Sequence, residues 1–340
     1  MTEVKPGKYV ELDVKDRRIL YELSKNARFS LTNVAKRVGL SREVVTYRLE
    51  VLAKKGILTG FTTIVDVKRL GKLKHIVYLQ LQHFDKEWEG QFIEKLVKDR
   101  DIIWIATCGG KWDVGLLIAS NSLQEFDRTL GNITSLCGAY LNDYMILSEV
   151  RESYLGLGLL MEGMPPSKGY YIRDTASFQK ELESPKPDMA VFTKKDLGIL
   201  KMLVQDARIR IIDIAKSLGV SQQFVKSRIK ALIRTGVIAG FMPMVSFYMQ
   251  GYQWNMAFLR FANITEQEEA RLVAYLKKHP NMLWYVKTLG RWNMELSIFS
   301  RDSSHYKEIL NSLRTEFSGA IKDYESVMIF NQYKYFHSLE

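Results

Sequence analysis

Two stretches of this chain repeat almost the same phrase at a spacing of 180 residues. Residues 33–52 read NVAKRVGLSREVVTYRLEVL, and residues 213–232 read DIAKSLGVSQQFVKSRIKAL. Aligned without a gap, residues 12–71 and 192–251 share 19 identities in 60 positions. Two copies are too few for a solenoid, in which stacked repeats share one continuous core. The chain is therefore a tandem duplication, and each copy must bury a core of its own.

The duplication divides the 340 residues into five predicted segments. Residues 152–190 hold four of the seven prolines and show no sustained hydrophobic period, which is typical of a linker. The first part of each copy spans residues 12–60 and 191–240. The second part spans residues 61–151 and 241–331.

Basic charge is concentrated in the first part of each copy. The chain has a net charge of +11, and residues 12–60 carry 11 Lys or Arg against 5 Asp or Glu, while residues 192–240 carry 10 against 3. The segments 72–150 and 252–330 carry 8 against 11 and 10 against 9. A basic excess of this size favours a polyanion, either nucleic acid or an anionic membrane surface. The sequence therefore places the polyanion-binding surface in the first parts.

The first part of each copy predicts three short helices joined by tight turns. In the first copy, Ser30 can cap the second helix, which ends at Gly39, a usual place for a left-handed residue. Ser41 then caps a third, amphipathic helix. This arrangement is a helix-turn-helix, whose last helix is sized for a DNA major groove. The following residues 57–67, ILTGFTTIVDV, alternate as a small β wing would.

The outward side chains of the third helix in each copy are the candidate DNA contacts. They are Ser41, Arg42, Glu43, Thr46, Tyr47 and Arg48 in the first copy, and Ser221, Gln222, Gln223, Lys226, Ser227 and Arg228 in the second. Arginine favours guanine and glutamine favours adenine in the major groove. Arg48 and Arg228 lie at the edge of the inward face, where each can hold a phosphate, an internal carboxylate or a base. A merely solvated helix face is the alternative interpretation.

The second part of each copy predicts the order βαββαβ. The elements expected in the first copy are residues 73–82, 87–99, 102–108, 112–120, 123–133 and 139–150. This order is the ferredoxin-like arrangement. The predicted fold class is therefore α+β, with two tandem copies of a winged helix-turn-helix domain followed by a ferredoxin-like βαββαβ domain. Such a sheet has helices on one face only, so we expect its other face to pair with another copy or chain.

The motif LDVKDRRILYELSKNARFSLTNVAKRVGLSREVVTYRLEVLAKKGILTGF resembles the N-terminal half of leucine-responsive/AsnC-family transcriptional regulators. The βαββαβ part looks like the ligand-responsive domain of that family. The resemblance implies a bacterial or archaeal regulator of double-stranded DNA whose sheet domains pair face to face, with small effectors, often amino acids, near that pairing. Family members normally carry one copy and dimerise, so this chain would carry a dimer's worth, as an intramolecular pseudo-dimer or a homo-oligomer.

The resemblance also implies an effector loop of pattern G-x-x-D between the second and third strands. The matching residues are Gly110, Trp112 and Asp113 in the first copy, and Gly290, Trp292 and Asn293 in the second. The carboxylate is lost in the second copy, which would remove a partner for an ammonium group. The alternatives are a plain hairpin turn whose Asp or Asn bonds its own backbone, and tryptophans that fill the sheet-sheet interface.

Enzyme, metal and membrane signatures are missing from the sequence. No Walker-type phosphate loop occurs, and Cys108 and Cys137 lack metal-type spacing, so we expect no enzyme, no metal and no cofactor. Two alternatives stay open: a tetrapyrrole-modifying enzyme of this architecture, and a regulator that acts mainly by recruiting basal transcription factors. The N-terminal MTEVKPGKYVELD lacks the apolar core of a signal peptide, and no run approaches membrane-spanning length. We therefore expect a cytoplasmic protein with no membrane partner.

Overall fold

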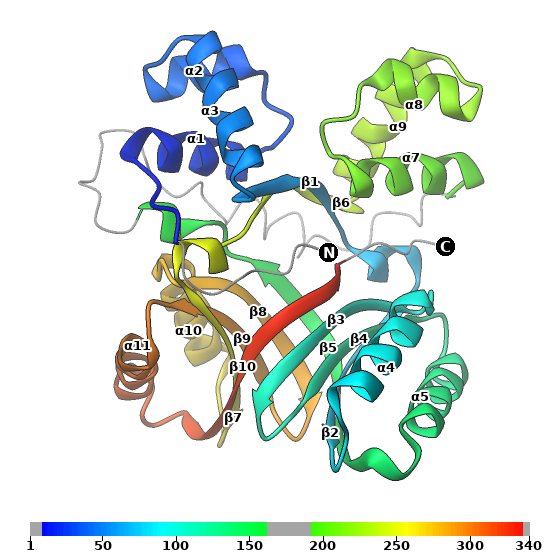
Figure 1. The fold of residues 1–340 in the computed structure, drawn as a ribbon, viewed down its shortest axis with the longest axis vertical. Coiled ribbons are helices and arrows are strands. Elements are labelled where there is room, and N and C mark those ends of the chain that lie inside the picture. Colours follow the sequence, from blue (N-terminus) through cyan, green and yellow to red (C-terminus); the bar gives the residue numbers. More distant parts are fainter. Residues whose placement is uncertain (1–8, 162–191, 336–340) are drawn as a thin grey trace.

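The computed structural model describes residues 9–161 and 192–335. The two helix-turn-helix parts form separate lobes above one large β-barrel, and a two-stranded ribbon lies between the lobes and the barrel (Figure 1). The lobes comprise α1 (Val14–Lys25), α2 (Leu31–Val38) and α3 (Arg42–Lys54), and α7 (Lys194–Gln205), α8 (Ile211–Leu218) and α9 (Gln222–Arg234). The described residues thus confirm the predicted fold class.

The predicted helix boundaries in the first lobe are confirmed by their caps. The Ser30 hydroxyl accepts a hydrogen bond from the backbone N–H of Asn33 at 3.2 Å. Gly39 ends α2 in the left-handed region at φ 70°, where a residue without a Cβ is least strained. The Ser41 hydroxyl accepts from the N–H of Val44 at 3.2 Å and so begins α3. Local sequence alone is therefore enough to position these helices.

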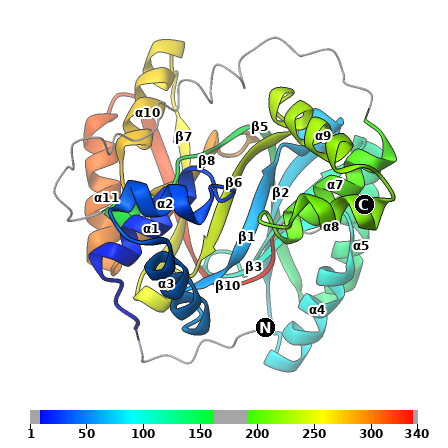
Figure 2. The same cartoon turned by 90° about the horizontal axis from the view of Figure 1, so that it is seen from above.

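The strand that follows each lobe pairs with its counterpart in the other copy. The strand β1 (Leu58–Val65) runs antiparallel to β6 (Ile238–Val245), and together they form a separate two-stranded sheet. The sequence predicted a wing within each copy, whereas the structure gives one ribbon shared by both. Figure 2 shows α3 and α9 on opposite sides of this ribbon. The ribbon exists because each strand is too short to be stable alone and finds the matching edge in its duplicate.

The two ferredoxin-like parts close into one eight-stranded antiparallel barrel in the order β10-β3-β4-β2-β5-β8-β9-β7. The first copy contributes β2 (Leu73–Leu81), α4 (Lys86–Lys98), β3 (Ile102–Gly110), β4 (Val114–Ser120), α5 (Leu123–Cys137) and β5 (Leu141–Tyr154). The second contributes β7 (Gln253–Phe261), α10 (Glu266–Lys278), β8 (Met282–Gly290), β9 (Met294–Ser300), α11 (Ser303–Glu316) and β10 (Ile321–Tyr335). Short 3-10 helices follow three of the strands, η1 (Val67–Leu70) after β1, η3 (Gly158–Met161) after β5 and η4 (Tyr248–Gln250) after β6, and a fourth, η2 (Gly138–Tyr140), follows α5.

Closure occurs at both edges of the two sheets. The strand β5 pairs with β8 from Leu147–Gly290 to Tyr154–Trp284, and β10 pairs with β3 from Val327–Gly110 onward. The four helices α4, α5, α10 and α11 cover the outside (Figure 1). The predicted pairing of the sheets therefore takes place within the chain, and no barrel strand is left with an open edge, which would invite pairing with another chain.

The barrel interior is filled with aromatic side chains. Tyr78 and Phe258 meet edge to face with their ring centroids 4.9 Å apart, and Trp104 and Trp254 do the same at 6.3 Å. Gly115 lies beside these rings, and a Cβ there would come within 2.8 Å of the Tyr78 ring. The barrel is therefore a packed core in its middle.

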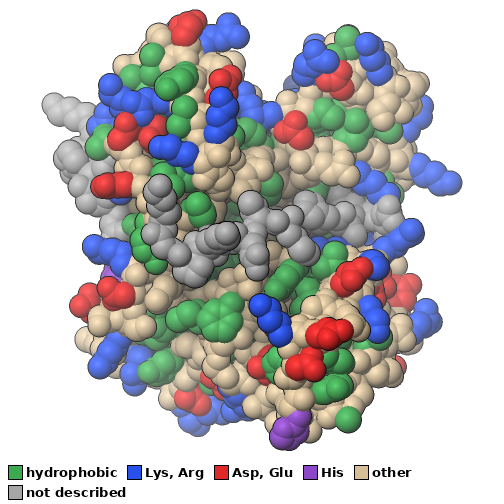
Figure 3. Space-filling view, in the orientation of Figure 1, with side chains coloured by type: hydrophobic (Ala, Val, Ile, Leu, Met, Phe, Trp, Pro, Cys, Tyr) green, Lys and Arg blue, Asp and Glu red, His purple; other side chains and the backbone are tan. Residues whose placement is uncertain are grey.

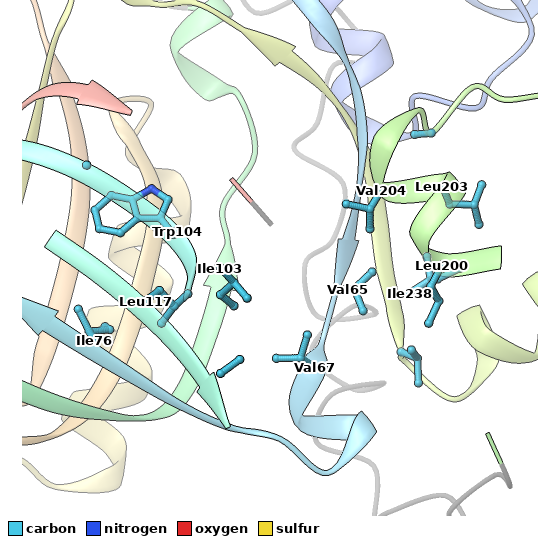
Figure 4. Close-up of a cluster of buried hydrophobic side chains, with 14 of the residues drawn as sticks. Val65, Val67, Ile76, Ile103, Trp104, Leu117, Leu200, Leu203, Val204 and Ile238 are labelled. Carbon is cyan, nitrogen blue, oxygen red and sulfur yellow. The ribbon is translucent and has the colours of Figure 1, made fainter. Parts of the chain in front are cut away.

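One hydrophobic cluster joins the barrel to the second lobe (Figure 4). Val65 of β1 and Val67 of η1 lie between the two bodies. On the barrel side they face residues that include Ile103, and on the lobe side they face residues that include Leu200 and Ile238. Burial of these side chains ties the lobe's position to the barrel through the short connection between β1 and β2.

The predicted linker at residues 152–190 falls mostly outside the described residues. Its described beginning is structured, because β5 extends to Tyr154. After β5, the side chains of Leu157, Leu159 and Leu160 around η3 are buried against the core of the first lobe. Among the described residues, no helix is both long and apolar enough to cross a membrane.

Candidate nucleic-acid interface

The third helix of the first lobe has one face that is polar and exposed and an opposite face that is apolar and buried. Val45, Leu49 and Leu52 are buried in the lobe core. Ser41, Arg42, Glu43 and Tyr47 are exposed, and Thr46 is half-buried. Tyr47 is 66% exposed, which is unusual for a large aromatic ring without a partner surface. The helix thus offers its predicted contact residues outward.

The third helix of the second lobe has the same construction with different chemistry. The Ser221 hydroxyl caps it by accepting from the N–H of Phe224 at 3.1 Å, and Gly219 precedes it at φ 63°. Its exposed side chains include the predicted contacts Gln222, Gln223, Lys226 and Ser227. The predicted residues therefore occupy equivalent positions in both lobes.

Two of the predicted contact residues use their hydroxyl protons within their own helix. The Thr46 hydroxyl donates to the carbonyl of Arg42 at 2.9 Å, and the Ser227 hydroxyl donates to the carbonyl of Phe224 at 2.8 Å. In this arrangement, each oxygen can serve a DNA base only as an acceptor.

Arg48 and Arg228 are held by internal carboxylates, which is one of the three roles left open by the sequence. Arg48 donates to Asp13 at 2.7 Å and to Asp16 at 2.8 Å. Arg228 donates two hydrogen bonds to the Asp196 carboxylate, of 2.6 and 2.8 Å. Burial acts to raise the pKa of Asp196, but the hydrogen bonds from Arg228 and Thr193 outweigh it and hold this pKa below the usual value. These arginines brace the third helix against the first.

The lobes are also fastened to each other across the ribbon. The Arg208 guanidinium donates to the carbonyls of Ala27 and Phe29, the latter at 3.1 Å. Reciprocally, Arg28 donates to the carbonyl of Ala207 at 2.5 Å. The sequence showed these two arginines only as identical positions of the repeat. The structure shows that they form a reciprocal clasp, which fixes the placement of one recognition helix relative to the other.

Two exposed charged residues on the outer faces of these helices were not among the predicted DNA contacts, although Glu50 was expected to face outward. Glu50 lies one turn after Thr46 on α3, and Lys230 lies one turn after Lys226 on α9. The i, i+4 spacing from residues already selected was the signal that could have found them. Lys and Arg side chains, with Asp and Glu between them, are spread over both lobes (Figure 3).

The predicted effector loops are brought to equivalent barrel positions, between β3 and β4 and between β8 and β9. Asp113 accepts a hydrogen bond from the N–H of Leu81 at 2.7 Å, and Asn293 accepts from the N–H of Phe261 at 2.9 Å. Both side chains therefore secure the end of a neighbouring strand, so an Asn can replace the Asp there. Burial raises the pKa of Asp113.

The two loop tryptophans differ in their partners. Trp112 and Trp292 are 1% and 2% exposed. The Trp112 indole N–H donates to Glu325 at 2.6 Å, whereas the buried Trp292 N–H has no acceptor among the described residues. Gly110 and Gly290 start the loops at φ 122° and 136°, where a side chain would be strained. The tryptophans pack as core residues, in agreement with the alternative that they fill the interface between the two sheets.

No group of three or more His, Cys, Asp or Glu side chains suited to a metal ion occurs in the described ranges. Cys108 and Cys137 are buried free thiols, and burial raises their pKa values to about 12 and about 11.

Comparison with known proteins identifies a family model that matches both copies and relatives that match about one copy's length. A family model described as winged helix-turn-helix DNA-binding matches residues 12–59 and 192–239. The proline dehydrogenase transcriptional activator of Rhodobacter capsulatus is 32% identical over 125 residues, which cover 35% of this chain and 79% of that protein. The transcriptional regulator AzlB of Bacillus subtilis is 30% identical over 118 residues, which cover 34% and 75%. Each relative thus corresponds to about one copy of the duplication.

The whole chain also resembles a solved enzyme. The crystal structure of the siroheme decarboxylase NirDL superposes with a TM-score of 0.61 at 12% identity, covering 95% of this chain and 93% of that one. At this identity the likeness shows a shared fold. It contradicts the prediction that the chain is not an enzyme, because an enzyme has this architecture over nearly the whole length. Missing sequence motifs were a poor ground for that exclusion, since one fold can carry unrelated functions.

Proposed function

The chain belongs to the leucine-responsive/AsnC family of transcriptional regulators, and on this premise we propose that it reads one asymmetric double-stranded DNA site with two non-identical recognition helices. The observation that carries the proposal is the equivalent placement of α3 and α9 with different exposed side chains. An ordinary homodimer presents two identical helices and selects a palindrome. This chain presents Arg42 and Glu43 on one side, and Gln222 and Gln223 on the other.

The chemistry of these side chains sets the expected base preference of each half-site. Arg42 favours guanine through O6 and N7, and Gln222 or Gln223 favours adenine through N6 and N7. Each good bidentate contact discriminates by about 1–3 kcal/mol against the wrong base. The two half-sites should therefore differ in sequence.

Selection of binding sites from random DNA tests the proposal. We expect a consensus whose halves differ, and recovery of a perfect inverted repeat would refute it. Single variants then separate base contacts from phosphate contacts: Arg42→Ala should change the preference of one half only, whereas Lys36→Ala on α2 should weaken all sequences alike. Equal losses on selected and scrambled duplexes for Arg42→Ala would make it a phosphate contact.

A small effector, such as an amino acid, is proposed to act at the loops around Asp113 and Asn293. Its support is the family's loop pattern, and the difference between Trp112 and Trp292 would make the two sites unequal. A thermal-shift screen of the amino acids, with and without Asp113→Asn, tests this. A stabilising amino acid whose effect falls in the variant supports the loop site, and unchanged melting with every amino acid refutes it. Basal transcription factors are further proposed partners, to be tested by pull-down with the purified factors.

A second candidate function is tetrapyrrole chemistry, favoured by the likeness to the siroheme decarboxylase over 95% of the chain. A second structure of that enzyme holds an iron-uroporphyrin III analogue. Titration of the purified chain with an iron-uroporphyrin, followed by visible absorbance, tests this candidate. A saturable spectral shift at one equivalent supports it, and an unchanged spectrum counts against it.

A further inference from the structure

The exposed faces of the two recognition helices differ in charge. Along the outward stripe, four positions correspond between the copies. Read from α3 to α9, the pairs are Glu43 and Gln223, Thr46 and Lys226, Tyr47 and Ser227, and Glu50 and Lys230. These positions hold two carboxylates and no cation in α3, and two cations and no carboxylate in α9. With the adjoining pair Arg42 and Gln222 included, residues 42–50 of α3 expose two carboxylates and one cation, whereas residues 222–230 of α9 expose two cations and no carboxylate.

Three of these four charges are available to a partner. Glu50, Lys226 and Lys230 are exposed, and none of the three forms an ion pair with any other described residue. The nearby arginines differ, because Arg48 and Arg228 are each committed to internal carboxylates. The structure thus distinguishes the cations that brace each lobe from those that face outward.

DNA responds to the two faces differently. Each cation that neutralises a phosphate releases counterions and binds any sequence, with a salt slope of about 0.9 per contact. A carboxylate in the groove is repelled by the same phosphates. It is compensated only where it accepts a hydrogen bond from a base, as Glu can from the cytosine amino group. The face of α9 therefore favours DNA in general, and the face of α3 disfavours DNA of the wrong sequence.

We propose that the two copies divide the work of DNA recognition: α9, through Lys226 and Lys230, supplies sequence-independent affinity, and α3, through Glu43 and Glu50, supplies discrimination. The inference rests on the proposed DNA-binding function and adds Glu50 and Lys230 to its interface. The reciprocal arginine clasp holds the lobes in one arrangement, so an α9 lobe bound to phosphates brings α3 to the neighbouring groove. A wrong sequence there is then rejected by unpaired carboxylates.

Fluorescence anisotropy with a selected duplex and a scrambled duplex, across a series of salt concentrations, tests the division. Lys226→Ala/Lys230→Ala should weaken both duplexes alike and reduce the salt slope by about 2. Glu43→Gln/Glu50→Gln should raise affinity for the scrambled duplex several-fold and so lower the specificity ratio. Lys307→Ala and Glu308→Gln on α11 are the same types of substitution, each removing one charge from an exposed face of the barrel's outer layer, and should leave both quantities unchanged.

The outcomes distinguish a failure of this inference from a failure of the proposed DNA-binding function. If the wild type shows no preference for any selected duplex, the proposed function itself fails. If the wild type discriminates but the lysine variant keeps its salt slope, or the glutamate variant keeps its specificity ratio, the division of labour is refuted. Circular dichroism of each variant excludes unfolding as the cause, because all four substituted side chains lie on exposed or outward helix positions.

Discussion

Glu295→Gln should make the chain more stable at neutral and alkaline pH. Glu295 is only 4% exposed, and it points into the barrel because its neighbours Met294 and Leu296 pack beneath the outer helices. Its carboxyl group lies near the Tyr78 side chain. Burial in this aromatic interior raises the pKa of Glu295 from the ordinary 4.5 to about 8. A buried carboxyl group without a cation is expected to stay protonated at neutral pH.

The sign and size of the effect follow from linkage between proton binding and folding. Below pH 4.5 the carboxyl group is neutral in both the folded and unfolded states, so it contributes no pH dependence. Between pH 4.5 and about 8 the unfolded chain releases this proton while the folded chain keeps it, so stability falls as pH rises. The full loss corresponds to about 5 kcal/mol as an upper bound. Glutamine cannot ionise, so the variant escapes this loss.

Urea unfolding followed by tryptophan fluorescence, from pH 5 to pH 9, measures the difference. The urea midpoints of wild type and Glu295→Gln should lie close together at pH 5 and separate progressively up to pH 8. Glu308→Gln, an exposed glutamate on α11, is the matched control and should follow the wild type throughout. A midpoint difference between Glu295→Gln and wild type that stays constant over this range would show that Glu295 ionises normally in the folded chain.

Three further changes test the contacts that hold the lobes and loops. Arg228→Ala removes the two hydrogen bonds that Arg228 donates to the buried Asp196 and leaves only those from Thr193. It should cost about 2–3 kcal/mol in urea unfolding, with Arg228→Lys recovering only part; an unchanged midpoint would contradict this. Arg208→Met removes the bonds to two carbonyls of the other lobe. It should reduce affinity for the whole DNA site while sparing isolated half-sites, as anisotropy can show; equal losses on both would speak against the clasp. Asp113→Asn keeps an acceptor for the N–H of Leu81 and should change thermal stability by less than about 0.5 kcal/mol, whereas Asp113→Leu should cost about 1–3 kcal/mol.

Local patterns were sufficient for the helices and strands of each copy. Ser41 and Gly39 act within a few residues of themselves, so a cap and a left-handed turn can be recognised without knowing the rest of the chain. The strands of the ferredoxin-like parts were predicted for a similar reason, because their apolar runs must be covered wherever they lie. The exposed positions of α3 and α9 follow from helical periodicity alone.

The partners of these elements were beyond local patterns. Arg48 could be assigned to a phosphate, a base or a carboxylate until the fold brought Asp16 within 2.8 Å. The pairing of β1 with β6 joins residues that lie between 173 positions (Val65 and Ile238) and 187 positions (Leu58 and Val245) apart in the chain, which no local periodicity records. Glu295 illustrates the same limit. The alternating pattern of its strand does not reveal that the Glu295 side chain points into a closed aromatic interior.

The duplicated sequence thus settles that two helix-turn-helix lobes and two ferredoxin-like sheets form, because caps, turns and hydrophobic periods act over one or two turns of chain. The fold as a whole settles how those parts meet: a shared ribbon, a closed barrel and a reciprocal arginine clasp. These features depend on strand edges and buried carbonyls that find their partners in the other copy. They fix the relative placement of two recognition helices whose outward residues had already diverged in sequence.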